Sequence, residues 1–117
     1  MKHGARVATT IELLQKIWSG NIPAANVVDG YFKRARFAGS SDRRTIKELF
    51  YTIIRSRERL NWWFLRSGIS KHFSSRAAMI IYLSLAEKKT FDELSNLFTG
   101  QLNQPKCLNE EETLLTT

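Results

Sequence analysis

Cysteine and histidine are scarce in this sequence. Cys107 is the only cysteine among 117 residues, and His3 and His72 are the only histidines. A single cysteine excludes an internal disulfide, and these three residues do not have the spacing of a structural zinc site. A chain without disulfides suits a reducing compartment, so we expect a cytoplasmic protein.

Motifs of the common catalytic chemistries are also missing. The chain contains no GxGxxG and no Gly-rich phosphate loop. The acidic run 110–112 is typical of a helix start rather than of paired catalytic carboxylates. No histidine lies near Cys107 in sequence, so a small connector residue is favoured over a nucleophile. We therefore expect no catalytic residue, metal or cofactor in this chain, which by itself is not an enzyme.

Long hydrophobic runs are absent too. No apolar stretch approaches the roughly 20 residues of a membrane-spanning helix, and the start, MKHGARVATT, lacks the apolar core and cleavage site of a secretory signal. Hydrophobic residues still make up 43% of the chain, which is enough for one buried core. We expect one small domain that does not bind membranes.

Strand signals are nearly absent, and helical spacing of apolar residues is found throughout. It predicts an all-α fold with helices near 5–19, 23–36, 42–67 and 74–88, and a short helix that ends near Phe98. Residues 74–88 are apolar almost all round, which is typical of a central, buried helix.

Local signals refine this pattern. Ser41 or Asp42 is expected to cap the helix that follows the FAGSS loop, and the sequence TFDE predicts a capping box at residues 90–93. Arg57 falls near the middle of the apolar face of 42–67. We therefore expect a break near Ser56 and two helices rather than one.

The final residues carry a further capping pattern, NEEE, at 109–112. Nine residues are too few for an isolated helix, since about 12–15 are marginal even in good sequences. Either this turn packs on the domain, or the chain is part of something longer. The second alternative is favoured here.

The positive charge is concentrated in one segment. The chain carries a formal charge of +7, and between Lys33 and Arg66 ten basic residues face three acidic ones. The remainder has eight of each, so the whole excess lies in this segment. Such a patch favours a polyanionic partner, RNA or DNA before acidic protein or lipid. The alternative is a solvated, solubilising face.

A helical wheel of 42–67 sorts this segment into two faces. Ile46, Phe50 and Phe64 fall on the apolar face, and Trp63 at its edge is expected to be core. On the opposite face, basic residues alternate with aromatic ones at spacings of three and four. These are Arg44, Lys47, Tyr51, Arg55, Arg59, Trp62 and Arg66.

This stripe has the chemistry of an RNA-binding surface. Arginine offers a planar fork of donors to phosphate oxygens and stacks on bases, and an exposed aromatic ring stacks on an unpaired base for roughly 1–3 kcal/mol. The alternative for Trp62 alone, which we favour for that residue, is that it covers a neighbouring helix while the arginines snorkel over it. For the arginines as a group we favour binding.

Three stretches resemble a known family: ARVATTIELL, then YFKRARFAGSSDRRTIKELFYTIIRSRERLNWWF, and later RAAMIIYLSL. They look like the NusB-like helical domain at the N-terminus of the RsmB/Sun family of bacterial rRNA cytosine-5 methyltransferases. PKCLNEEETLL resembles the junction toward the methyltransferase domain of that family. The similarity covers nearly the whole chain, and its helical patterns are shared with NusB itself.

The resemblance implies a compact bundle of about six or seven helices. Residues 1–108 would form a NusB-like RNA-binding domain, and 109–117 would begin a linker helix toward a catalytic domain. That domain would hold S-adenosylmethionine and methylate a cytosine of 16S rRNA, with this portion binding and positioning the RNA. Cys107 matches no catalytic motif of the family.

Within the resemblance, either Arg43 or Arg44 is expected to pair with a carboxylate such as Asp29 or Glu48 while the other faces RNA. Arg6 is a weaker candidate, with an ordinary exposed residue as its alternative. The candidate RNA-binding residues are Arg6, Lys33, Arg34, Arg36, Arg43, Arg44, Lys47, Arg55, Arg59, Trp62 and Arg66.

Two other functions remain open. A free-standing NusB-type antitermination factor would bind RNA beside a ribosomal-protein partner. A helical module that binds an acidic protein through its positive face would need no RNA.

Overall fold

The computed structural model describes residues 1–20, 22–36, 38–69 and 71–116. Within these ranges the chain forms seven α-helices, one short 3-10 helix and no strand, so the all-α prediction is confirmed. The elements are α1 (His3–Ser19), α2 (Ala24–Arg34), α3 (Ser40–Arg55), α4 (Arg57–Arg66), α5 (Ser75–Leu85), α6 (Phe91–Leu97), α7 (Glu110–Thr113) and η1 (Leu114–Thr116).

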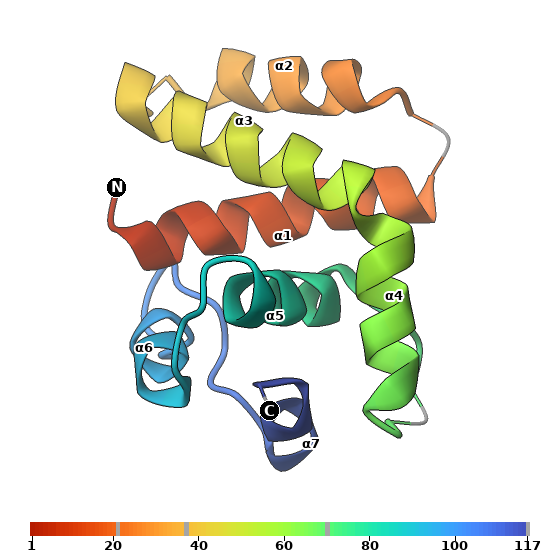
Figure 1. Cartoon of the computed structure of the whole chain (residues 1–117). Helices are drawn as coiled ribbons and strands as arrows, with labels where there is room; N and C mark the ends of the chain where they lie inside the picture. The colour runs from red at the N-terminus through yellow and green to blue at the C-terminus, as the bar shows by residue number, and fades with distance from the viewer. Residues whose placement is uncertain (21, 37, 70, 117) are drawn as a thin grey trace.

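The helices stack in layers around α1 (Figure 1). α2 and α3 lie side by side above it, α5 lies below it, and α4 runs down one side of the molecule. α6 contacts α1, and η1 contacts α5. None of the helices in the described ranges combines the length and the apolarity needed to cross a bilayer.

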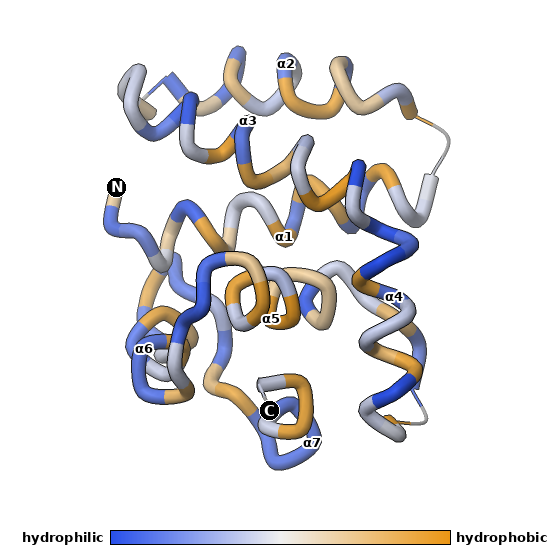
Figure 2. Tube along the Cα trace, viewed as in Figure 1, coloured by the Kyte–Doolittle hydropathy of each residue, from blue (hydrophilic) through white to orange (hydrophobic). Residues whose placement is uncertain are grey.

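The core is built where α1, α3 and α5 meet. α5 is buried along nearly its whole length, including Met79, Ile80 and Leu83, and Figure 2 shows most of it as hydrophobic. This confirms the central, buried helix predicted from its apolar composition. α3 contributes Ile46 and Phe50 from one face, at the spacing expected of an amphipathic helix.

The long stretch 42–67 breaks where the sequence predicted. α3 ends at Arg55 and α4 begins at Arg57, while the Ser56 N–H still donates to the Thr52 and Ile53 carbonyls at 3.0 and 3.1 Å. The Arg57 guanidinium lies 4.7 Å from the Trp18 ring centroid. A cation on the apolar side is thus placed over an aromatic ring instead of inside the core.

Two of the predicted helix N-caps are confirmed, and one is wrong. Thr90 caps α6 and Asn109 caps α7, each in a capping box with the glutamate three residues on. The N-cap of α3 is Gly39, so the prediction of Ser41 or Asp42 was wrong. Asp42 lies three residues further, where its carboxylate accepts from the Gly39 N–H at 3.4 Å.

The C-terminal turn packs on the helical body. Leu115 is buried in the main hydrophobic cluster, and Arg76 of α5 holds this end from the other side. Its Nη2 donates to Glu112 Oε1 at 2.9 Å and to the Lys106 and Cys107 carbonyls at 2.8 and 3.0 Å. The turn therefore packs on the domain, and the expectation that the chain is part of something longer stays a prediction.

Candidate nucleic-acid interface

The first group of cations lies where the end of α2 meets the start of α3. Phe32 of α2 is buried, and two cations of α3 cover its ring: Arg43 at 5.4 Å and Lys47 at 5.8 Å from the centroid. The Arg43 Nε also donates to the Ala38 carbonyl at 3.0 Å. These contacts hold two positive charges at the surface without neutralising them.

The structure separates the roles of Arg43 and Arg44. Arg43 is partly buried and fixed by its contacts with Ala38 and Phe32, so it is the structural one of the pair. Arg44 is exposed. The expected partner carboxylates were not found, since neither arginine forms an ion pair with Asp29 or Glu48 in the described part of the chain. Three more exposed cations lie at the end of α2 or just after it: Lys33, Arg34 and Arg36.

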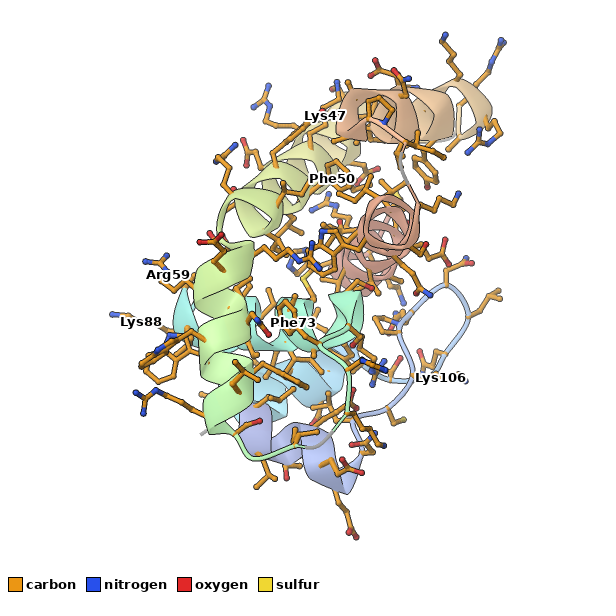
Figure 3. The ribbon with its side chains drawn as sticks, turned by 90° about the vertical axis from the view of Figure 1, so that its right-hand side faces the viewer. Lys47, Phe50, Arg59, Phe73, Lys88 and Lys106 are labelled. Atoms are coloured by element: carbon orange, nitrogen blue, oxygen red, sulfur yellow. The ribbon has the colours of Figure 1, made fainter. Side chains whose placement is uncertain are left out.

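The second group lies along the end of α3 and along α4. Arg55, Arg59 and Arg66 are all exposed. The Arg55 Nη2 is 3.4 Å from Thr52 Oγ1, a weak contact that leaves its charge available. Figure 3 shows Arg59 pointing outward from α4, whereas Phe50 and Phe73 point into the molecule.

Two tryptophans accompany these arginines on α4. Trp62 is 47% exposed and Trp63 is 43% exposed, so the prediction that Trp63 belongs to the core was wrong. Their rings meet edge to face with centroids 4.8 Å apart. The buried positions of α4 are Leu60 and Phe64, and Trp63 therefore falls on a flank rather than on the inner face.

Arg66 stacks on this pair. Its guanidinium carbon lies 3.8 Å from the Trp62 ring centroid. Such stacking fixes the plane of the guanidinium while leaving its N–H groups free to donate outward. The Trp62 ring is thus covered by an arginine, as the alternative for Trp62 anticipated, but the residue still keeps nearly half of its surface in solvent.

Arg6 differs from these cations because it is paired with a carboxylate. Its Nε donates to Asp42 Oδ1 at 2.8 Å, and the Met1 amino group lies 3.3 Å from Asp42 Oδ2. This arginine is engaged by a buried carboxylate and joins α1 to α3, so we do not include it in the interface. Asp42 was singled out by the sequence only as a helix start.

The basic residues between 33 and 66 differ from Arg6 in this respect. None of the ten basic side chains between residues 33 and 66 forms an ion pair with a carboxylate in the part of the chain that the structure describes. We call the exposed members of the two groups, together with Trp62, the basic surface: Lys33, Arg34, Arg36, Arg44, Lys47, Arg55, Arg59, Trp62 and Arg66.

One cation near this surface was not predicted. Lys88 is exposed, with a φ of 53° just after α5, and Figure 3 shows it on the same outward side as Arg59. It lies 22 residues beyond the basic segment in sequence. The charge count along the chain holds no signal that could have placed it there.

Other features of the described residues bear on metal binding and on acid–base chemistry. They contain no group of three potential metal ligands. Cys107 is exposed, and its thiol donates to the Thr99 carbonyl at 3.1 Å. A groove of about 1030 Å³ runs along α1 beside residues 101–104, and Glu12 is the only carboxylate among its described lining residues.

Comparison with protein families, with curated proteins and with solved structures finds no match for this chain. The resemblance noted in the sequence therefore stays a prediction.

Proposed function

We propose that the chain binds RNA through the basic surface, as the RNA-positioning part of an rRNA cytosine-5 methyltransferase. The observation that carries this proposal is the state of the cations between residues 33 and 66. They are numerous, mostly exposed, and unpaired with carboxylates among the described residues. Phosphate contacts supply most of the non-specific affinity for nucleic acids and need charges of this kind.

The arrangement of the cations supports a phosphate ligand over a merely solubilising face. Lys47 lies over Phe32, and Arg66 lies over Trp62. Aromatic rings thus restrict two long side chains of the basic surface before any ligand binds, and less conformational entropy is lost on binding. A face that only keeps a protein soluble does not require such restraint.

The aromatic residues favour a nucleic acid over an acidic protein. Trp62 and Trp63 are exposed beside Arg59 and Arg66. Bases stack on indole rings and on guanidinium planes, so arginine with exposed tryptophan suits a ligand with both phosphates and aromatic rings. The resemblance to the RsmB/Sun family points to rRNA as the RNA.

Under this proposal the chain contributes binding and not chemistry. S-adenosylmethionine and the reacting cysteine chemistry of that family would belong to another domain, in cis. A free-standing NusB-type factor would use the same surface but would require a ribosomal-protein partner for tight binding, and this requirement distinguishes it from the methyltransferase portion.

Charge reversal on the basic surface tests the proposal. We expect Arg44→Glu combined with Arg55→Glu to abolish RNA binding, because two exposed, unpaired cations become anions. Fluorescence anisotropy with labelled rRNA fragments measures the affinity, and helical circular dichroism checks the fold. The matched control is Lys16→Glu with Lys106→Glu, which changes the net charge equally. Both lysines are exposed and lie outside the segment, and Figure 3 places Lys106 on the other side of the molecule from Arg59.

Salt dependence gives a second readout. For single-stranded RNA the log–log slope of affinity against salt is about −0.7 per neutralised phosphate. The neutral variant Arg44→Gln should reduce the steepness of this slope by about 0.7. Unchanged affinity in a folded double variant, or an equal loss in the control, would refute the proposed surface.

A further inference from the structure

A small hollow lies beside Trp63, between α4, the end of α5 and the C-terminal turn. Its volume is about 150 Å³. Three large apolar side chains at the hollow remain exposed: Trp63 at 43%, Leu85 at 42% and Leu114 at 50%. The walls of the hollow include Trp63, Arg66, Ile81, Leu85, Leu114 and Leu115.

We propose that this hollow takes an unpaired RNA base. The RNA recognised by the protein is then single-stranded, or carries a bulged nucleotide, where it meets α4. This inference rests on the function proposed above and names the class of RNA that the basic surface binds.

The size of the hollow fits one ring. A cavity of about 150 Å³ in another protein takes a single benzene molecule, whereas pockets that enclose whole cofactors measure about 300 Å³ or more. Trp63 adds an indole to a wall that is otherwise largely aliphatic. A base placed there removes apolar surface from water and contacts an aromatic ring, which stabilises single-stranded complexes by roughly 1–3 kcal/mol per base.

One cation lines the hollow, and two more lie within four residues of its wall residues in the sequence. Arg66 lines it and is oriented by its stacking on Trp62. Arg59 lies four residues before Trp63, so it is one helical turn away on the same flank of α4. Lys88 follows Leu85 by three residues and lies on the same side of the molecule as Arg59 (Figure 3).

Neither duplex RNA nor a partner helix fits these features as well. In a duplex the faces of the bases are stacked on one another, and only an unpaired base offers a ring to the hollow. A docked amphipathic helix is anchored by apolar side chains at i, i+3 or i+4, and i+7, so it needs a long groove. A hollow with room for one ring provides a single anchor point.

The test compares single strands with duplexes. The affinity of a labelled oligoribonucleotide is measured by anisotropy, alone and annealed to its complement, at one salt concentration. We expect the single strand to bind about 10-fold more tightly than the duplex, from the stacking of one base. Trp63→Leu keeps an apolar side chain but removes the ring, and should abolish this preference. Trp63→Phe keeps an aromatic ring and should keep most of the preference for the single strand.

Tryptophan emission of the unaltered protein gives a readout that needs no variant. Trp18 packs against Phe73 and Arg57, and is partly buried, so a ligand that contacts indole rings reports mainly on Trp62 and Trp63. Single-stranded RNA should quench the emission, whereas heparin, a polyanion without bases, should bind and leave it nearly unchanged.

The outcomes separate the two proposals. If single strand and duplex bind with equal affinity and Trp63→Leu changes neither affinity, the base site is overturned and RNA binding stands. Quenching of the tryptophan emission by heparin to the same extent as by RNA would have the same consequence. Failure of either RNA to bind would overturn the proposed function itself. Tighter binding of an acidic amphipathic helical peptide, lost in Trp63→Leu, would assign the hollow to a protein partner instead.

Discussion

Asp42 shows how a single residue joins distant parts of this chain. Its carboxylate, nearly buried, receives Arg6 Nε at 2.8 Å, the Met1 amino group at 3.3 Å and the Gly39 N–H at 3.4 Å. The hydrogen bond from Arg6, first among these contacts, lowers the pKa of Asp42 below its ordinary value. The ionised form of this residue therefore stabilises the packing of α1 on α3.

This arrangement predicts a pH-dependent loss of stability. Because the pKa of Asp42 is lower in the folded state, its contribution is fully present above its unfolded pKa of about 3.9 and is lost as the pH falls through the folded pKa. Asp42→Asn should therefore lower the free energy of unfolding at pH 7, and the difference from the unaltered protein should shrink below about pH 4. Urea unfolding of both proteins at several pH values measures the free energy of unfolding and its change with pH. A difference that is the same at pH 7 and pH 2.5 would contradict the role of the ionised carboxylate.

Trp63 illustrates the limit of a helical wheel at the residue scale. The wheel of an unbroken 42–67 helix puts Trp63 at the edge of the apolar face, yet 43% of its surface is exposed. The buried positions of α4 are Leu60 and Phe64, and the wheel had already placed Phe64 on the apolar face. A wheel gives the direction of a side chain around the helix axis, but only the neighbouring elements decide whether a position at the edge of that face is covered.

At the scale of elements, the C-terminal segment is held by an arginine from another helix. Arg76 reaches from α5 to the Glu112 carboxylate and to two carbonyls before it, and its guanidinium lies 5.0 Å from the Phe98 ring centroid. Burial disfavours the charged form of Glu112, but the hydrogen bonds from Arg76 and the Asn109 N–H outweigh it and lower its pKa. A four-residue helix is too short to be stable alone, so these contacts and the burial of Leu115 keep it in place.

Removing the positive charge of Arg76 should loosen the C-terminal segment locally. Arg76→Gln should lower the free energy for opening residues 110–116 by roughly 1.5–3 kcal/mol, the contribution of a hydrogen bond to a charged group. Amide hydrogen exchange of this segment measures it. The control is Lys71→Gln, whose pair with Glu111 is largely exposed and should contribute about 1 kcal/mol or less. Equal effects of the two variants would show that the Arg76 contacts do not hold the turn.

For the molecule as a whole, one hydrophobic cluster draws residues from α1 to α6 and from η1. Elements that share one core lose their packing together, and small domains of this kind usually unfold in a single transition. The basic surface lies outside this cluster, so its charges can change without removing buried contacts.

Because there is a single core, substitutions of buried and of exposed side chains should differ sharply in their effect on the free energy of unfolding. Phe50 of α3 is 0% exposed, and Phe50→Ala should lower the free energy of unfolding by roughly 3–5 kcal/mol. Leu65 is 69% exposed, and Leu65→Ala should change it by about 0.5 kcal/mol or less. Urea unfolding followed by circular dichroism and by tryptophan emission should give coincident curves. Curves that separate would show that part of the chain unfolds independently.

Much of the secondary structure could be predicted because it depends on neighbours in sequence. The central helix α5, the break near Ser56 and the capping boxes at Thr90 and Asn109 all follow from residues within a turn or two of each other. The concentration of charge between residues 33 and 66 is likewise a property of the chain alone. Its use in RNA binding stays a prediction.

By itself, then, the sequence determined an all-α protein with a basic middle segment, because helix periodicity and capping act over only a few residues. Only the tertiary structure decided that Arg6 pairs with Asp42, that Arg43 is structural, that Trp63 is exposed beside a hollow, and that Lys88 lies on the side of Arg59. Each of these depends on which helix packs beside which. That packing brings together residues far apart in the chain, and no local pattern records it.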